Sequence, residues 1–334
     1  MSATAKYVIV FCLATSSLLL AWRTDKKMAT SPNWPIPRYI LVVDSLRFQL
    51  GKQLFYDPSL SADGKTSCGS CHKQQYAFSD GGNPVSKGCN GATGLRNTLP
   101  LFNLSWNTSF MWDGGINHLE IQPLGPITSH IEMNTSLAQI AITLRQSAAY
   151  RQQFILAYGD SAITGQHILQ LLASFLSALQ SKDSRYDKFI NQETGGNLNV
   201  QELHGLLLFR QHCSSCHQEP LFTDYSFYDV GLDYSPHPDS GRMAITRQLA
   251  DSLKFRVPSL RNIAVTAPYM HDGRYRTLMQ VLNFYTDSVQ KRAGVAAQMC
   301  QPLRLSVKDK EDIIAFLGTL TDTAFLTNPK FAAD

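Results

Sequence analysis

The chain has 334 residues, of which 44% are hydrophobic and 17% are charged, and its formal net charge at pH 7 is +4. These values are typical of a globular protein with a sizeable core, and the length fits about two domains. Lysine and arginine residues are scattered and form no basic stripe, which argues against nucleic acid as a partner.

The N-terminus has the pattern of an export signal. Lys6 precedes the apolar run YVIVFCLATSSLLLAW at residues 7–22, and a charged segment followed by an apolar one is typical of a signal peptide. The run is shorter than the ~20 residues of a usual membrane-spanning helix, and no A-x-A cleavage site follows it. We therefore expect a signal peptide or an uncleaved anchor over 1–22, with a buried N-terminal helix as the alternative. Residues 23–38 are polar and Pro-rich, which predicts a linker.

The rest of the chain is predicted to be mostly α-helical, with long ordered loops. Apolar residues recur at helical spacing in residues 43–55, 136–159, 164–181, 199–213 and 306–320. Asn199 and Glu202 have the spacing of a capping box. The last stretch begins with a cap at Ser306 and is expected to end near Gly318. Strand-like alternation is scarce.

Two Cys-x-x-Cys-His sequences match the pattern of c-type haem attachment. They are Cys68, Cys71 and His72, and then Cys213, Cys216 and His217. Two thiols on one turn of helix reach the two vinyl groups of a haem, and the histidine is carried under the iron as its ligand. A thioredoxin-like pair would need a βαβ context, and a zinc site would need a second ligand pair at finger spacing; neither is present. Chance alone would rarely produce two copies.

Covalent haem also fits an exported protein, because c-type haem is attached outside the cytoplasm in bacteria. The predicted location is therefore the periplasm, with the N-terminus either removed or anchored in the inner membrane. Cys89 and Cys300 belong to neither motif. An oxidising compartment permits a disulfide between them, and two unpaired thiols are the alternative.

The two haem motifs lie in similar halves. Each motif follows a Gly-x-x-Leu-Phe sequence and precedes an aromatic-Met-ring-Asp-Gly sequence, at 51–55, 110–115, 205–209 and 269–274. The repeat is far longer than a solenoid repeat and indicates a duplicated domain. We predict two cytochrome c-like helical domains, each around one covalent haem, over 39–190 and 191–334.

These motifs occur together with RNTLPLFN at 96–103, IQPLGPITSHIEM at 121–133 and LRNIAVTAPYMHDGRYRTL at 260–278. In this combination and order the chain resembles the bacterial di-haem cytochrome c peroxidase family, from about Leu50 to Leu320. The resemblance implies that peroxide reacts at a first haem while a second haem stores and relays electrons. It also implies a protein that is often a homodimer.

The resemblance assigns roles in the peroxide reaction to four residues. Glu132 would be the general acid and base that moves a proton between the peroxide oxygens. Gln122 and Pro126 would complete the distal pocket, with Gln122 holding the peroxide. Trp112 would carry electrons between the haems, and its counterpart His271 would lie near the second haem. From the residues alone, Glu132 also fits a surface carboxylate and Trp112 a core side chain.

A calcium ion between the domains is a further implication of the resemblance. Its ligands would be the Asn97 side chain and the main-chain carbonyl oxygens of Thr266 and Pro268. Oxygen ligands suit this hard cation. Without the resemblance, these three residues would be assigned to loops.

The chain departs from the common family pattern at the first haem. Most members carry a histidine that caps the iron, and this chain has Gly88 at that position and no histidine between His72 and His118. We therefore expect an open iron that reacts with peroxide without prior reduction. His130 is an alternative cap.

A second departure concerns the second haem. Most members use a methionine as its distal ligand, and this chain has Tyr285 at that position, as in the MauG-like branch of the family. Phenolate ligation lowers the reduction potential and favours high oxidation states. Met279 and Met270 are alternative ligands, and Tyr285 also fits a core aromatic of the helix before it.

Three functions follow from these observations. The first is a peroxidase that reduces hydrogen peroxide with electrons from a small c-type cytochrome or a copper protein, its irons held by His72, His217 and Tyr285. The second uses the same peroxide step to oxidise side chains of a protein substrate, as in the MauG-like branch. That branch has a tryptophan where this chain has Gln211, so its use of a protein substrate is not carried over. Trp34 and Trp106 are expected to be exposed and are the other aromatic candidates for drawing electrons from a protein substrate. The third is a non-catalytic di-haem electron carrier.

Overall fold

The computed structural model describes residues 34–41, 44–234, 238–301 and 303–333. The predicted signal at 1–22 and most of the predicted linker at 23–38 lie outside the described residues. Within the described residues, no helix is both long enough and apolar enough to cross a membrane.

The described chain is mostly helical, as predicted. In chain order its α-helices are α1 (Ser45–Tyr56), α2 (Cys68–Cys71), α3 (Leu124–Thr128), α4 (Leu137–Gln146), α5 (Ala148–Tyr158), α6 (Gly165–Ala178), α7 (Arg185–Ile190), α8 (Val200–His212), α9 (Met243–Thr246), α10 (Leu278–Asn283), α11 (Val307–Gly318) and α12 (Thr323–Thr327). Two short strands, β1 (Phe227–Tyr228) and β2 (Phe255–Arg256), pair in antiparallel fashion. A π-helical turn, Phe284–Ser288, continues α10.

Side-chain caps set the ends of these helices. The Asn199 side chain accepts from the Glu202 N–H, and the Glu202 carboxylate accepts from the Asn199 N–H, each at 2.9 Å, so the capping box of α8 is confirmed. The predicted bounds of α11 are confirmed as well. The stretch at 136–159 is not one helix, because Ser147 ends α4 and caps α5 by accepting from the N–H of Tyr150 at 3.3 Å.

The repeated Gly-x-x-Leu-Phe sequences lie where the main helices of each half touch. A Cβ on Gly51 of α1 would lie 2.1 Å from the carbonyl oxygen of Leu171 in α6. A Cβ on Gly205 of α8 would lie 1.9 Å from the carbonyl oxygen of Asp312 in α11. Real Cβ atoms do not approach this closely, so any side chain at either glycine would push the helices apart. The glycine of each repeated sequence therefore allows the close contact between two helices.

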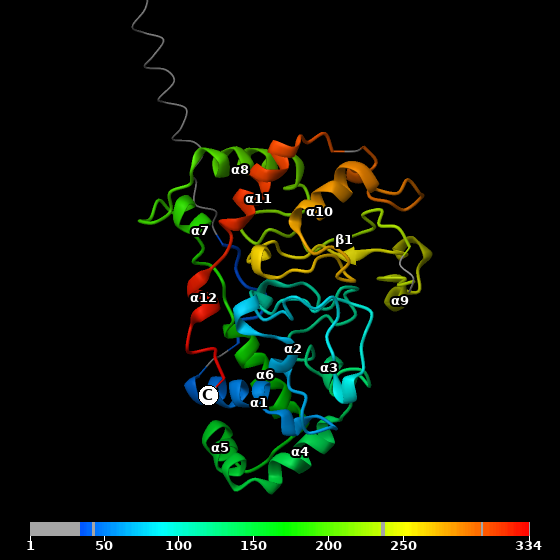
Figure 1. Ribbon diagram of the computed structural model, residues 1–334. Helices are drawn as coiled ribbons and strands as arrows, with labels where there is room; N and C mark the ends of the chain where they lie inside the picture. Colours follow the sequence, from blue (N-terminus) through cyan, green and yellow to red (C-terminus); the bar gives the residue numbers. More distant parts are fainter. Residues whose placement is uncertain (1–33, 42–43, 235–237, 302, 334) are drawn as a thin grey trace, which may run out of the picture.

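Each of these helix pairs is surrounded by its own hydrophobic core. The first core includes Phe55 of α1 and Phe175 of α6, whose ring centroids are 5.0 Å apart. The second includes Phe209 of α8 and Phe316 of α11, with ring centroids 5.1 Å apart. In Figure 1 the first pair lies in the lower part of the molecule and the second in the upper part.

The C-terminal segment returns from the second core to the first. Phe325 in α12 and Phe331 beyond it are buried in the first core. The Gln74 amide donates to the carbonyl oxygens of Phe325 at 3.1 Å and Asn328 at 2.8 Å. Figure 1 shows α12, in red, between the upper and lower parts. The last residues of the chain therefore belong to the packing of its first half.

Two equivalent asparagines also join the halves. Asn103 and Asn262 are buried and have left-handed backbones, with φ of 54° and 56°. Their amides donate to one residue, Ser181: Asn103 to its carbonyl oxygen at 2.8 Å and Asn262 to its hydroxyl at 2.9 Å. Asparagine tolerates left-handed backbone better than most residues, which explains why it recurs in the repeated segments.

Candidate active site

The first Cys-x-x-Cys-His sequence forms a short helix with its histidine at the end. Ser67 caps α2, and His72 follows Cys71 directly. The Nδ1 atom of His72 lies 2.6 Å from the carbonyl oxygen of Phe78. A carbonyl only accepts, so Nδ1 carries the proton and Nε2 keeps its lone pair for a metal. Burial lowers the pKa of His72 to about 4, which keeps the ring neutral and able to bind iron.

The second Cys-x-x-Cys-His sequence has the same arrangement at the end of α8. The Nδ1 atom of His217 lies 3.1 Å from the carbonyl oxygen of Phe222, so this ring also presents Nε2. Burial lowers the pKa of His217. Cys213 and Cys216 are free thiols, as are all the cysteines of the described chain. Both motifs therefore offer two thiols and a neutral imidazole, the donor set of a c-type haem.

Cys89 and Cys300 are unpaired in the described chain. Cys89 is buried and Cys300 is exposed. The backbone N–H of Asp63 donates to the Cys89 sulfur at 3.2 Å. Of the two alternatives, the structure therefore has the pair of free thiols.

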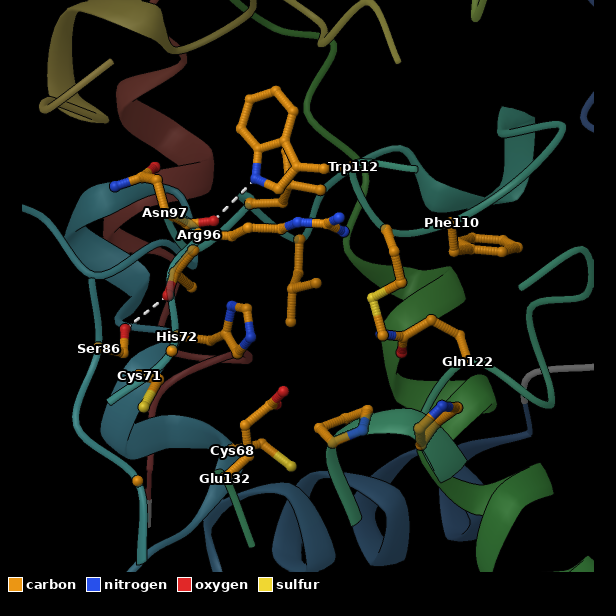
Figure 2. Close-up of a pocket in the computed structure, with 18 of the residues that line it drawn as sticks. Cys68, Cys71, His72, Ser86, Arg96, Asn97, Phe110, Trp112, Gln122 and Glu132 are labelled. Atoms are coloured by element: carbon orange, nitrogen blue, oxygen red, sulfur yellow. Dashed lines mark hydrogen bonds between the residues drawn. The ribbon is translucent and has the colours of Figure 1, made fainter. Parts of the chain in front are cut away.

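A cavity of about 620 Å³ lies beside the first motif. This volume is within the ~300–1,000 Å³ of ligand and cofactor pockets. The cavity is lined by predicted site residues from both sides, shown in part in Figure 2: Cys68, Cys71, His72, Asn97, Trp112, Gln122, Pro126 and Glu132. The residues expected to hold a haem and those expected to act on its ligand therefore share one space.

The residues expected to form the distal pocket lie in α3 or next to it. Pro126 lies in α3, Gln122 lies just before it, and Glu132 follows it. Glu132 is exposed where it lines the cavity. Neighbouring protein atoms desolvate its carboxyl and raise its pKa, and a hydrogen bond from Ser129 opposes this only in part. Its protonation therefore changes closer to neutral pH than that of an ordinary glutamate.

The loop that carries Gly88 packs against the backbone of Glu132. The N–H of Cys89 donates to the carbonyl oxygen of Glu132 at 2.7 Å. A Cβ on Gly88 would lie 2.1 Å from the carbonyl oxygen of Ile131 and 2.7 Å from the Cα of Glu132. No side chain fits at Gly88, so this loop packs tightly against the main chain that carries the Glu132 side chain.

Among the described histidines, His72 alone lines this cavity. His118 and His130 are exposed and absent from its lining. The His118 ring packs edge-on against Tyr39, with ring centroids 5.0 Å apart. The lining thus holds one imidazole, on the side of the two cysteines.

Trp112 lies where the two halves meet. Its Nε1 donates to the carbonyl oxygen of Asn97 at 2.8 Å, and its own carbonyl oxygen accepts from the N–H of Arg256 at 2.7 Å. The N–H of Asn97 donates to the carbonyl oxygen of His271 at 2.7 Å. Asn97 thus connects the ring residues of the two repeated sequences. His271 itself stacks on Phe255, with ring centroids 3.8 Å apart.

Tyr285 lies in the π-helical turn after α10. Burial raises the pKa of its phenol, and repulsion from Cys213 and Cys216 in their ionised forms adds to this rise. That electrostatic coupling indicates that Tyr285 lies near the second cysteine pair. π-Helical turns occur frequently at functional sites.

The segments expected to hold calcium are adjacent. The Asn97 amide donates to the carbonyl oxygens of Asn83 at 3.3 Å and Pro84 at 3.0 Å. The N–H of Gly82 donates to the carbonyl oxygen of Ala267, between Thr266 and Pro268, at 2.9 Å. No group of three acidic, histidine or cysteine side chains suited to a metal occurs in the described residues. A cation at this position would have to be bound by amide and main-chain oxygens, and the calcium site stays a prediction.

One group at the junction was missed by the sequence analysis. Arg96 bridges Asp113 at 2.5 Å and Asp239 at 2.6 Å, so it joins loops from both halves beside the cavity. Burial disfavours the charge on Asp239, but hydrogen bonds from Arg96 and Gly241 outweigh this and lower its pKa. Asp113 belongs to the repeated sequence, but nothing in the sequence pairs it with residues of the other half.

Known proteins resemble this chain over most of its length. Residues 45–195 match the family described as di-haem cytochrome c peroxidase. The chain is 34% identical over 286 residues to the methylamine utilization protein MauG of Methylorubrum extorquens, covering 84% of this chain and 80% of that protein. It is 33% identical over 282 residues to the cytochrome c551 peroxidase of Nitrosomonas europaea, covering 82% and 79%.

A solved structure resembles this chain over most of its length. The crystal structure of a MauG-like protein associated with microbial copper homeostasis superposes with a TM-score of 0.83 and 33% identity, over 91% of this chain and 98% of that one. The diheme peroxidase BthA of Burkholderia thailandensis, at 23% identity and a TM-score of 0.73, shares the fold. This chain therefore belongs to the di-haem cytochrome c peroxidase family.

Proposed function

We propose that this protein is an exported, periplasmic di-haem peroxidase that reduces hydrogen peroxide to two water molecules. Residues 39–190 and 191–334 would form two cytochrome c-like domains, each around one covalent haem. The first would be the peroxide site and the second the electron relay. The observation that carries the proposal is that His72, with a free Nε2, and Glu132, with a raised pKa, line the same cavity.

When bound, the first haem supplies the iron at which the O–O bond of peroxide is cleaved. Glu132 takes a proton from one peroxide oxygen and returns it to the other, which leaves as water. Gln122 holds the peroxide by a hydrogen bond, and Pro126 shapes the wall of the pocket. Two electrons and two further protons complete the reduction to a second water.

Trp112 would pass electrons one at a time between the halves. Its position supports this role, because it lines the cavity and its main chain contacts Arg256 of the second half. His217 and Tyr285 would bind the second iron, with His271 nearby. The electron donor would be a small c-type cytochrome or a copper protein. A calcium ion held by Asn97, Thr266 and Pro268 would stabilise the junction, and the protein could act as a homodimer.

A second candidate function is peroxide-dependent oxidation of protein side chains. Two observations favour it: the half-buried Tyr285 is electrostatically coupled to the second cysteine pair, and His72 alone among the described histidines lines the cavity. The non-catalytic carrier has less support, because it gives no role to Glu132 at the cavity.

Spectroscopy of the purified oxidised protein, before and after addition of peroxide, tests the proposal. We expect two covalent haems, a high-spin signal from the first, and a spectral change with peroxide that needs no prior reduction. Turnover with a reduced small cytochrome distinguishes peroxide reduction from protein oxidation. Fewer than two covalent haems, or a fully low-spin oxidised protein that is inert to peroxide, would contradict it.

A further inference from the structure

Lys310 is a buried cation whose hydrogen-bond partners are both neutral. It lies in α11, and the residue is only 7% exposed. Its Nζ lies 2.9 Å from the Asn283 side-chain oxygen and 2.8 Å from the Thr286 hydroxyl. Within the described chain it takes part in no ion pair. Removing an ammonium group from water without an anionic partner costs stability, so an apolar residue would serve better if this position only filled space.

Its two partners stand on either side of one structural junction. Asn283 is the last residue of α10, and Thr286 lies in the π-helical turn that follows. The Thr286 hydroxyl also donates to the Asn283 carbonyl oxygen at 3.2 Å. The three residues therefore form a closed cluster that spans the change from α-helical to π-helical geometry.

A π-helical turn needs such support. It is a rare conformation that persists where the surroundings hold it in place. One residue of this turn, Tyr285, lies between the two partners of Lys310 in sequence. Fixing Asn283 and Thr286 therefore fixes the backbone from which the phenol projects.

We propose that Lys310 is a positioning residue for Tyr285: by holding Asn283 and Thr286 it sets the direction in which the tyrosine is presented to the second haem. This rests on the proposed role of Tyr285 as a ligand. Lys310 acts on the geometry of the turn and does not touch the cofactor. Its loss should therefore change the coordination of the second haem and leave the first unchanged.

The test compares four variants of the full-length, haem-loaded protein. Tyr285→Phe defines the spectrum without the phenol. Lys310→Met keeps the length of the side chain and removes its donors. Thr286→Val removes one acceptor with almost no change of shape, and covers the case in which Lys310→Met does not fold. Lys308→Met, on an exposed position of the same helix, is the matched control.

The readouts are the electron paramagnetic resonance signal and the reduction potential of the second haem. We expect Lys310→Met to lose the tyrosine-dependent signal in part or completely, Thr286→Val to shift it in the same direction, and Lys308→Met to match the wild type. Covalent haem content and the first-haem signal should not change. If Tyr285→Phe changes the second haem while Lys310→Met and Thr286→Val do not, the inference is wrong and the ligation stands. If Tyr285→Phe changes nothing, the proposed ligation and the inference both fail.

Discussion

The indole N–H of Trp112 donates to the main-chain carbonyl oxygen of Asn97 at 2.8 Å, and this bond fixes the ring at the junction of the two halves. We expect Trp112→Phe to fold and to bind both haems, because a phenyl ring keeps most of the packing. Electron delivery to the first haem should slow at least tenfold, since phenylalanine is much harder to oxidise than tryptophan.

Stopped-flow measurement of electron transfer after mixing with a reduced donor checks this prediction. Trp106→Phe is the control. The expectation that Trp106 is exposed is wrong: it is as buried as Trp112, and its Nε1 also donates to a carbonyl oxygen, that of Pro35. An unchanged rate in Trp112→Phe would show that electrons take another route.

Glu132→Gln should react with peroxide about 10²–10⁴ times more slowly, the usual contribution of general acid–base catalysis. The amide keeps the size of the carboxyl and cannot accept the peroxide proton. Rapid-mixing spectroscopy with excess peroxide measures the rate. Glu120→Gln, outside the cavity lining, should react like the wild type. Equal rates for the two variants would remove Glu132 from the mechanism.

The peroxide reaction should lose rate as the pH falls. Glu132 must be ionised to take the first proton, and desolvation by the surrounding protein raises its pKa above the ordinary value of about 4.3. The rate is therefore full above the raised pKa and declines as the pH falls through it, starting at a higher pH than a fully hydrated glutamate would give. A pH–rate profile from acid to neutral pH should show this limb, and Glu132→Gln should lack it.

Gly88→Ala should slow the peroxide reaction even though the new methyl group carries no chemistry. Its Cβ would collide with the main chain of Ile131 and Glu132, so the loop that supports the carboxylate must shift. Gly94→Ala is the control in the same loop region, because its Cβ would meet only the flexible end of Ile131 at 3.2 Å. A wild-type rate in Gly88→Ala, at unchanged haem content, would show that the loop does not position Glu132.

Arg96→Met should lower the free energy of unfolding by about 1–3 kcal/mol, the usual cost of leaving a charged hydrogen-bond partner unsatisfied. Asp113 and Asp239 would both lose this partner. Denaturant unfolding of the haem-loaded protein measures the change. Arg47→Met breaks the exposed pair with Asp44 and should cost less than about 1 kcal/mol.

The contribution of Arg96 to the free energy of unfolding should also depend on pH. Asp239 has a lowered pKa in the folded protein. The stabilisation of the fold by its ionised carboxylate is therefore complete above the unfolded pKa of about 3.9, and it is lost as the pH falls through the lower folded value. Arg96→Met should therefore show a smaller loss of stability in acid than the wild type. An identical acid dependence in the two proteins would contradict this assignment.

Local patterns predicted much of the helical structure. The capping box at Asn199 and Glu202 and the bounds of α11 depend on residues close in sequence, and both were predicted correctly. The stretch at 136–159 was predicted as one helix because its apolar spacing continues through Ser147. That serine ends one helix and caps the next, and periodicity alone does not detect such a break.

The site was predictable where a motif specifies the chemistry. The Cys-x-x-Cys-His spacing predicts the haem-binding residues from sequence alone, and the structure shows the matching donor set of two thiols and a neutral imidazole in each motif. The fit of Gly88 against Glu132, the bridge formed by Arg96 and the cluster around Lys310 all join segments far apart in sequence. No periodicity or spacing encodes such contacts, so the structure was needed to find them.

The return of α12 to the first core has a consequence for how the molecule can be divided. Phe325 and Phe331 belong to the second half of the sequence and pack in the first core. The first half alone would therefore lack part of its own core, and cutting the gene between the two halves would not yield two independent proteins.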